Sequence, residues 1–282
     1  MNAKAVVFLA GIAAVSAWAA EGMFERKLTV SGAVDLDVVS DSGRVTIRAG
    51  GPGTLRVVGR IKTGTSWHPG LSPEEKVKRL EAAPPIEQSG NTVRIGHIRD
   101  RELDRNVSIS YEIEAPADST VRSRTDSGSQ LIEGIHGPVD AAADSGGIEI
   151  ADAGNEVHAT SDSGSLRLRG VRGPLTAKAD SGSITGSAIA GSIDAASDSG
   201  EIQMEQTAAS PIKIRSDSGS VTLRLPSSGG YDVSASSDIG HISSDLPLTV
   251  RGTAGHNRLQ GQLRGGGASL VVTTDSGSIR LQ

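Results

Sequence analysis

The chain contains no cysteine, which excludes disulfide bonds and zinc sites with cysteine ligands. Aromatic residues make up only 2% of its 282 residues, so a conventional globular core would have few large side chains to bury. The net charge is −5, and no cluster of Lys and Arg offers a stripe that could follow phosphates. Composition therefore argues against binding to nucleic acid and gives no reason to expect binding to anionic lipid.

Glycine, in contrast, is abundant at 36 residues, and many of these belong to a repeat. The triplet Asp-Ser-Gly returns with a constant period of 18 from Asp126 to Asp198 and once more, after a step of 19, at Asp217. A fixed period of this length is typical of repeat architectures. Counting two outlying copies, the predicted turn-forming residues are Asp41, Gly43, Asp126, Gly128, Asp144, Gly146, Asp162, Gly164, Asp180, Gly182, Asp198, Gly200, Asp217, Gly219, Asp275 and Gly277.

Between the triplets, apolar and polar residues alternate in two short runs. Ile148 and Ile150 flank Glu149 in the first run of one repeat, and Val157 and Ala159 begin the second run. Alternation with a period of two predicts strands that turn one face inward. Two strands and two turns fill one repeat. A stack of hairpins is possible, but so regular a repeat favours an all-β parallel β-solenoid with two short strands per coil.

The turn triplet has two other interpretations. Asp-Ser-Gly is also the active-site triplet of aspartic proteases, yet eight copies, most at a fixed spacing, predict a turn element. Stacked aspartates could bind calcium, but calcium-binding solenoids use Gly-Gly-x-Gly-x-Asp repeats, and this chain has none. We expect instead that each Asp caps its own turn and that each Gly takes a positive φ. No catalytic, cofactor-binding or metal-binding residue is predicted, and the six His residues show no metal-ligand spacing.

The N-terminus has the pattern of a secretory signal peptide. Met1–Lys4 is positively charged, Ala5–Val15 is apolar, and Ala17-Trp18-Ala19 is a small-x-small cleavage pattern. A membrane anchor is the alternative, but the apolar stretch is short for a span of about 20 residues. We predict a signal peptide over 1–19 and an exported protein, either periplasmic or extracellular at the cell surface. No membrane span is expected after cleavage.

Residues 20–282 are predicted to form a single solenoid domain with regular coils over 126–219. A helical insertion of about 66–85 interrupts it near the start. Ser72 is the expected N-cap, Pro73 the first helical residue, and Val77 and Leu80 the apolar ridge.

The sequence stops at Gln282 in a strand pattern, with no amphipathic helix to cover it. An uncovered solenoid end exposes unpaired strand groups. This predicts end-to-end self-association and leaves a self-assembling filament subunit as one functional hypothesis.

The stretch Ser108–Pro116, the serial Ser-Gly turns and the closing Thr-Thr-Asp-Ser-Gly-Ser-Ile-Arg-Leu resemble a known bacterial family. It is the β-strand-repeat adhesin family, a domain of unknown function that is widespread in exported proteins. The resemblance covers about 25–282. It implies a parallel β-solenoid and a role at the surface or in the envelope, and it brings no catalytic residues.

We therefore expect a non-enzymatic structural or adhesive module whose flat faces bind an envelope protein or glycan through many weak contacts. The candidate partner contacts are Arg167, Arg169, Lys178, Lys213 and Arg215, predicted to lie close together across successive coils, and Trp67. Trp67 is alternatively a packing residue between the helix and the solenoid. The competing hypothesis is an envelope carbohydrate-active enzyme, or a glycan binder, with its site near the insertion. Its candidate residues are Trp67, His68 and Glu74.

Overall fold

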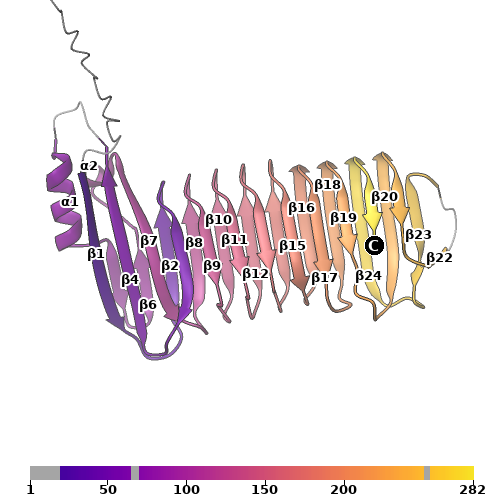
Figure 1. The fold of residues 1–282 in the computed structure, drawn as a ribbon, viewed down its shortest axis with the longest axis horizontal. Coiled ribbons are helices and arrows are strands. Elements are labelled where there is room, and N and C mark those ends of the chain that lie inside the picture. Colours follow the sequence, from indigo (N-terminus) through magenta and orange to yellow (C-terminus); the bar gives the residue numbers. More distant parts are fainter. Residues whose placement is uncertain (1–19, 65–69, 251–254) are drawn as a thin grey trace, which may run out of the picture.

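Two long β-sheets lie face to face along the axis of the molecule (Figure 1). The computed structural model describes residues 20–64, 70–250 and 255–282, and the predicted signal peptide lies outside them. The sheet that we call sheet A has 12 strands in the described ranges, and sheet B has 13. Most neighbouring strands are parallel, and the chain alternates between the sheets. The prediction of an all-β parallel solenoid with two strands per coil is confirmed.

The strands follow one another along each sheet in a fixed spatial order. In sheet A the order is β1 (Ala20–Thr29), β4 (Thr54–Thr63), β7 (Val107–Pro116), β3 (Val45–Gly50), β9 (Gln130–Glu133), β11 (Ile148–Ala151), β13 (Leu166–Arg169), β15 (Ile184–Ile189), β17 (Ile202–Gln206), β19 (Val221–Arg224), β25 (Ile279–Leu281) and β21 (Ile242–Ser244). In sheet B it is β22 (Leu248–Val250), β23 (Arg258–Leu263), β20 (Tyr231–Ile239), β24 (Ala268–Ser276), β18 (Ile212–Ser218), β16 (Ile193–Ser199), β14 (Leu175–Ala179), β12 (Val157–Ser161), β10 (Val139–Ala143), β8 (Thr120–Thr125), β2 (Asp35–Ser40), β6 (Thr92–Ile95) and β5 (Ile86–Ser89).

The sequence repeat sets the register of the central coils. Val139 of β10 pairs with Val121 on one side and Val157 on the other, each one period away in the sequence. Identical positions therefore stack, and the inward columns become continuous ladders. The alanine ladder that includes Ala141 and Ala159 is fully buried. Small side chains there let the sheets approach closely, so the core needs hardly any aromatic residues.

At the N-terminal end, the order of coils in space differs from their order in the sequence. The first coil, β2 with β3, lies between the coil of β6 and β7 and the coil of β8 and β9. Beyond it, β4 pairs antiparallel with β7, and β1 pairs antiparallel with β4. The first coil is thus enclosed by later parts of the chain.

The C-terminal end has the same arrangement. Strand β24 pairs with β18 on one side and β20 on the other, and β25 lies between β19 and β21. The last coil of the sequence is therefore interior. Sheet B continues past it with the antiparallel strands β23 and β22. The prediction that the chain stops at an open solenoid end is wrong, because strands from earlier in the chain fold around the last coil. An uncovered last coil is therefore no longer an argument for end-to-end association.

The helical insertion forms as predicted. Helix α1 (Pro73–Ala82) begins after Ser72, whose side chain accepts a hydrogen bond from the Glu75 backbone N–H. The Glu75 side chain in turn accepts one from the Ser72 backbone N–H. Val77 and Leu80 are buried in the main core. The helix covers β1, the edge strand of sheet A, in the view of Figure 1.

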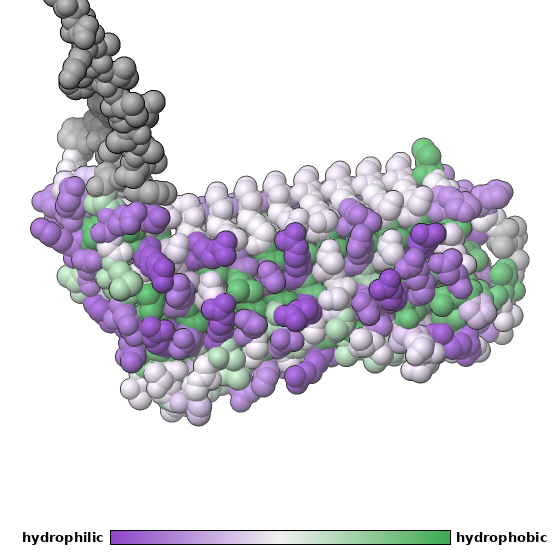
Figure 2. All heavy atoms as spheres, viewed as in Figure 1, coloured by the Kyte–Doolittle hydropathy of each residue, from purple (hydrophilic) through white to green (hydrophobic). Residues whose placement is uncertain are grey.

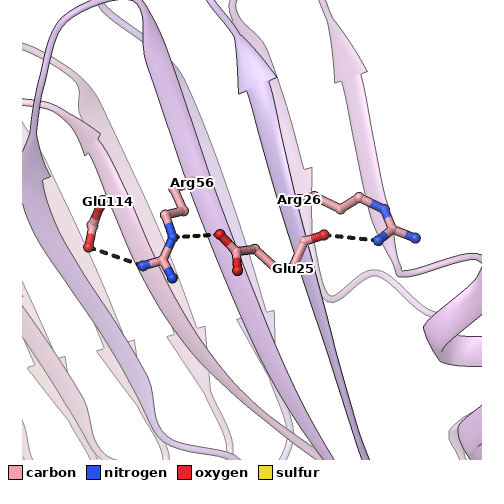
Figure 3. A network of polar contacts seen from close by, with 4 residues as sticks. All are labelled: Glu25, Arg26, Arg56 and Glu114. Carbon is pink, nitrogen blue, oxygen red and sulfur yellow. Dashed lines mark hydrogen bonds and ion pairs between the residues drawn. The ribbon is translucent and has the colours of Figure 1, made fainter.

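Charged residues cross the three antiparallel strands at this end of sheet A. Arg56 of β4 lies between Glu25 of β1, at 2.8 Å, and Glu114 of β7, at 3.3 Å (Figure 3). The hydrogen bond and charge of Arg56 hold the pKa of Glu25 below its usual range. Because these side chains are largely exposed, they contribute little to stability and act mainly by favouring this strand register.

Candidate functional site

The Asp-Ser-Gly turns form the upper edge of the solenoid, where sheet B strands pass into sheet A strands (Figure 1). Figure 2 shows this edge as an evenly spaced row of pale residues. A Cβ atom placed on Gly146 would lie 1.9 Å from the Gly128 carbonyl oxygen of the preceding coil, and Gly164 meets Gly146 in the same way at 2.0 Å. None of the predicted turn glycines has a positive φ. That expectation is wrong: glycine is required here by the close approach of stacked backbones.

Hydrogen bonds between coils hold these turns. The Ser145 N–H donates to the Asp126 carbonyl at 2.7 Å, and the Ser163 N–H donates to the Asp144 carbonyl at 2.8 Å. The inward hydroxyl just before the triplet adds a second link. Ser161 Oγ donates to the Gly146 carbonyl at 3.2 Å and accepts from the Gly164 N–H at 2.8 Å.

The aspartate carboxylates take no part in this network. Within the described residues, no turn aspartate accepts a hydrogen bond on its side chain. The expectation that each Asp caps its own turn is therefore wrong, because backbone groups of the neighbouring coil and, at several of the turns, the hydroxyl of a preceding Ser or Thr supply the bonds. The carboxylates instead form an exposed acidic row. Burial, and then the charges of Asp41 and Asp144 in the neighbouring coils, raises the pKa of Asp126.

The burial and the neighbouring charges that raise the pKa of Asp126 predict the effect of Asp126→Asn on stability. A carboxyl whose pKa is higher in the folded protein destabilises the fold above that pKa and stops doing so below the unfolded value of about 3.9. Because solvent screens this exposed group, the variant should be more stable than the wild type at pH 7 by at most about 0.5 kcal/mol, and the gain should vanish near pH 3. Urea denaturation at both pH values measures it, with Asp245→Asn outside the row as the control. An equal gain at both pH values would contradict the electrostatic cause.

The outer face of sheet B carries two hollows in the same register. One, of about 330 Å³, lies over β8, β10 and β12, and the other, of about 340 Å³, lies over β14, β16, β18 and β24. On each strand, the hollows are lined by the residue just before the strand and by the first outward side chain, for example Pro174 and Thr176 at β14. We call the two together the furrow. Its aliphatic lining includes Pro138, Pro174 and Pro211. Seven adjacent strands at about 4.8 Å give it a length of about 29 Å.

One side of the furrow is a single column of outward side chains. Strand pairing places them side by side in the order Arg122, Asp140, His158, Thr176, Asp194, Lys213 and Val271. Arg122 and Lys213 are balanced by Asp140 and Asp194. Lys213 also lies 4.0 Å from Asp194. The column therefore offers donors and acceptors without a net sign of charge. The furrow beside this column forms only when the coils stack.

The predicted contact residues do not share one face. Arg167 and Arg169 lie on β13 in sheet A, whereas Lys178, Lys213 and Arg215 lie on sheet B. The expectation that the five lie together is wrong, because successive strands of the chain alternate between opposite sheets. On sheet B, Lys178 and Arg215 both pair with Ala196, in the second outward column. Trp67 and His68 lie outside the described residues. Glu74 is exposed in the first turn of α1.

Residues 120–282, more than half of the chain, match the model of the Toastrack DUF4097 family. The chain belongs to this family. Its Toastrack region begins at β8 and takes in every regular coil and the C-terminal end. The enclosed first coil and the helical insertion lie before it. Membership agrees with the resemblance found in the sequence and with the solenoid fold.

Several solved structures are similar to this Toastrack protein at low identity. A Bacteroides fragilis protein provisionally assigned as an adhesin is 13% identical with a TM-score of 0.49, over 92% of this chain and 97% of the other. A Clostridium sporogenes protein provisionally assigned to cell adhesion is 11% identical, with a TM-score of 0.27, over 92% and 98%. A Parabacteroides distasonis protein provisionally assigned to lipid binding is 12% identical, with a TM-score of 0.30, over 93% and 97%. No curated protein matches the chain.

Within residues 20–64, 70–250 and 255–282, no group of three or more His, Asp or Glu side chains is arranged to hold a metal ion. In the same ranges, neither of the two helices has the length and apolar character that a membrane crossing requires.

Proposed function

We propose that the protein is an exported, non-enzymatic adhesive module that holds a neutral glycan of the cell envelope along the furrow of sheet B. The observation that carries this proposal is the repetition of one surface in seven adjacent strands. Each strand adds the same two positions to the furrow, so an extended chain lying along the solenoid axis meets evenly spaced contacts, although the side chains differ from coil to coil. Many weak contacts of this kind add up to useful avidity.

The chemistry of the furrow favours a neutral chain. The three prolines of its lining offer aliphatic surface that suits the C–H faces of sugars, and its outward column supplies both donors and acceptors for hydroxyl groups. The balance of Arg122 and Lys213 against Asp140 and Asp194 gives a polyanion no electrostatic advantage. Backbone hydrogen bonds along β8–β18 are already used between coils, so an added peptide strand has no edge to pair with on this face.

Export rests on the predicted signal peptide, and the family resemblance supports a role at the surface or in the envelope. An envelope protein as partner, an enzyme near the insertion and a filament subunit are the competing hypotheses, and none of them predicts glycan binding that depends on the furrow.

The test is the binding of residues 20–282 to soluble neutral and anionic envelope polysaccharides, by affinity electrophoresis. Thr176 lines one hollow on β14, and β14 pairs with β12, which lines the other, so Thr176→Arg should block the furrow and weaken binding about tenfold, equivalent to about 1.4 kcal/mol. Thr185→Arg makes the same change on sheet A and is the matched control, expected to bind within about twofold of the wild type. Binding of no neutral glycan, or equal losses in both variants, would overturn the proposal.

A further inference from the structure

A small polar cavity lies at the N-terminal end of the row of stacked turns. Its volume is about 20 Å³, and its wall includes Asp41 of the first turn, Asp104 and Tyr111. Helix α2 (Arg101–Asp104) brings Asp104 to this place, and Asp100 caps the helix by accepting from the Glu102 N–H at 2.9 Å. A cavity of about 10–15 Å³ already holds one water molecule, so this one has room for a single small occupant.

Tyr111 presents its hydroxyl group to this cavity. The residue is only 2% exposed, and its hydroxyl has no hydrogen-bond partner in the part of the chain that the structure describes. A Cβ atom on Gly96, another wall residue, would lie 3.4 Å from that hydroxyl oxygen, which places the oxygen at the cavity. Among the described residues nothing competes for this hydroxyl, so it is open to an occupant of the cavity that bonds to oxygen.

The charges around the cavity are predominantly negative. Burial, and then the charge of Asp41, raises the pKa of Asp104. Burial, and then the charges of Asp104 and Asp41, raises the pKa of Tyr111. Lys76 of α1 partly compensates Asp104, but its Nζ donates to the Arg105 carbonyl, and burial lowers its pKa. Two carboxylates thus face one ammonium group that is bonded elsewhere.

We propose that this cavity is a cation site that takes one Ca²⁺ ion, bound by the carboxylates of Asp41 and Asp104 with the Tyr111 hydroxyl as a further oxygen ligand. Carboxylates and neutral oxygens in an irregular arrangement suit Ca²⁺, whereas Mg²⁺ demands a near-ideal octahedron. With two carboxylates, the dissociation constant should fall in the range of about 10⁻⁴–10⁻³ M that is found in extracellular modules.

The site differs from the rest of the acidic row. A central aspartate such as Asp162 also stacks on its neighbours and is exposed, but it does not line this cavity, which Tyr111 does. Bound Ca²⁺ would join the first coil to α2, two segments that lie far apart in the sequence. This inference stands apart from the glycan proposal, because the furrow lies on the outer face of sheet B.

The experiment titrates CaCl₂ into chelator-treated protein by calorimetry and follows the melting temperature in parallel, with MgCl₂ as the comparison. The wild type should bind about one Ca²⁺ and melt at a higher temperature, and it should bind Mg²⁺ more weakly. Asp104→Asn should abolish the response, and Tyr111→Phe, which keeps the ring, should weaken binding by about tenfold or more. Asp162→Asn is the matched control from the same acidic row and should bind like the wild type.

Three results would overturn the site. The first is that the wild type shows no stoichiometric binding at millimolar Ca²⁺. The second is that Asp162→Asn loses as much Ca²⁺ binding as Asp104→Asn, which would indicate diffuse attraction to the acidic row. The third is that Tyr111→Phe binds Ca²⁺ as tightly as the wild type. Circular dichroism of each variant without Ca²⁺ shows whether it is folded. If Asp104→Asn does not fold, Tyr111→Phe still decides the question.

Discussion

Replacing Gly146 with alanine should destabilise the fold by about 3 kcal/mol, at the upper end of what overpacking usually costs. The added methyl group would lie 1.9 Å from the Gly128 carbonyl oxygen and 2.7 Å from its carbon. Both are backbone atoms, held by hydrogen bonds between coils, so neither can rotate away as a flexible side chain would. Relief requires the two coils to separate, which weakens the stacking on which the solenoid depends.

The next residue in the sequence supplies the control. A Cβ atom on Gly147 would meet only the Ser165 carbonyl oxygen at 3.5 Å, an ordinary contact, and Gly147 has no positive φ. Gly147→Ala should therefore leave stability within about 0.5 kcal/mol of the wild type. Urea denaturation followed by circular dichroism compares the two. Similar stabilities for the two variants would mean that the stacked turns are not the close contact described here.

Removing residues 268–282 should cause a larger loss, on the order of 5 kcal/mol or more. The deletion takes away β24 and β25 and, with them, the fully buried Leu270, Val272, Ile279 and Leu281, each contributing about 2 kcal/mol. Because this coil lies inside the stack, β20 and β21 lose the strands on which they lie. Hydrogen exchange should become fast throughout β20–β23 and stay slow in β8–β15.

The matched control removes one whole repeat, 145–162, from the middle of the array. Asp144 would then be followed by Ser163, which restores an Asp-Ser-Gly turn and leaves the register of every remaining coil intact. This shortened protein should fold and keep exchange protection at both ends. The interior role of β24 and β25 would be refuted if the truncated chain kept slow exchange in β20–β23, since those strands would then have stacked directly on β18 and β19.

The features that the sequence predicted correctly are local ones. The alternation around Glu149 indicated a strand, the regular period of the triplets indicated a coil, and Ser72 with Glu75 indicated where α1 begins. Each depends on residues close together in the chain, so it can be read without knowing the neighbours. The roles of the turn residues were predicted less well. In an isolated turn, Asp side-chain bonds and a positive φ at Gly would determine the conformation, whereas in stacked turns the close approach of neighbouring backbones and the hydrogen bonds between coils determine it.

The order of the coils at the two ends was not predictable from the repeat. Leu36 pairs with Val93 on one side and Val121 on the other, yet all three have the same inward, aliphatic character. Repeats that match one another so well are interchangeable as neighbours, so the pattern cannot specify which pair is adjacent. The cavity beside Asp41 was not predictable for a related reason. Asp104 belongs to no triplet, and only the folded chain brings it to the end of the acidic row.

The enclosed first and last coils have a consequence for how the length of this protein can change. Each end of the solenoid is an elaborate structure in which distant segments interleave, so neither end can accept an extra coil without being rebuilt. In the middle of the array, each coil pairs only with the coils before and after it in the sequence. Gain or loss of one whole repeat between β10 and β17 would move the two ends about 4.8 Å apart or together while leaving both unchanged. The array is therefore a spacer whose length can change by whole coils while the structures at its two ends stay the same.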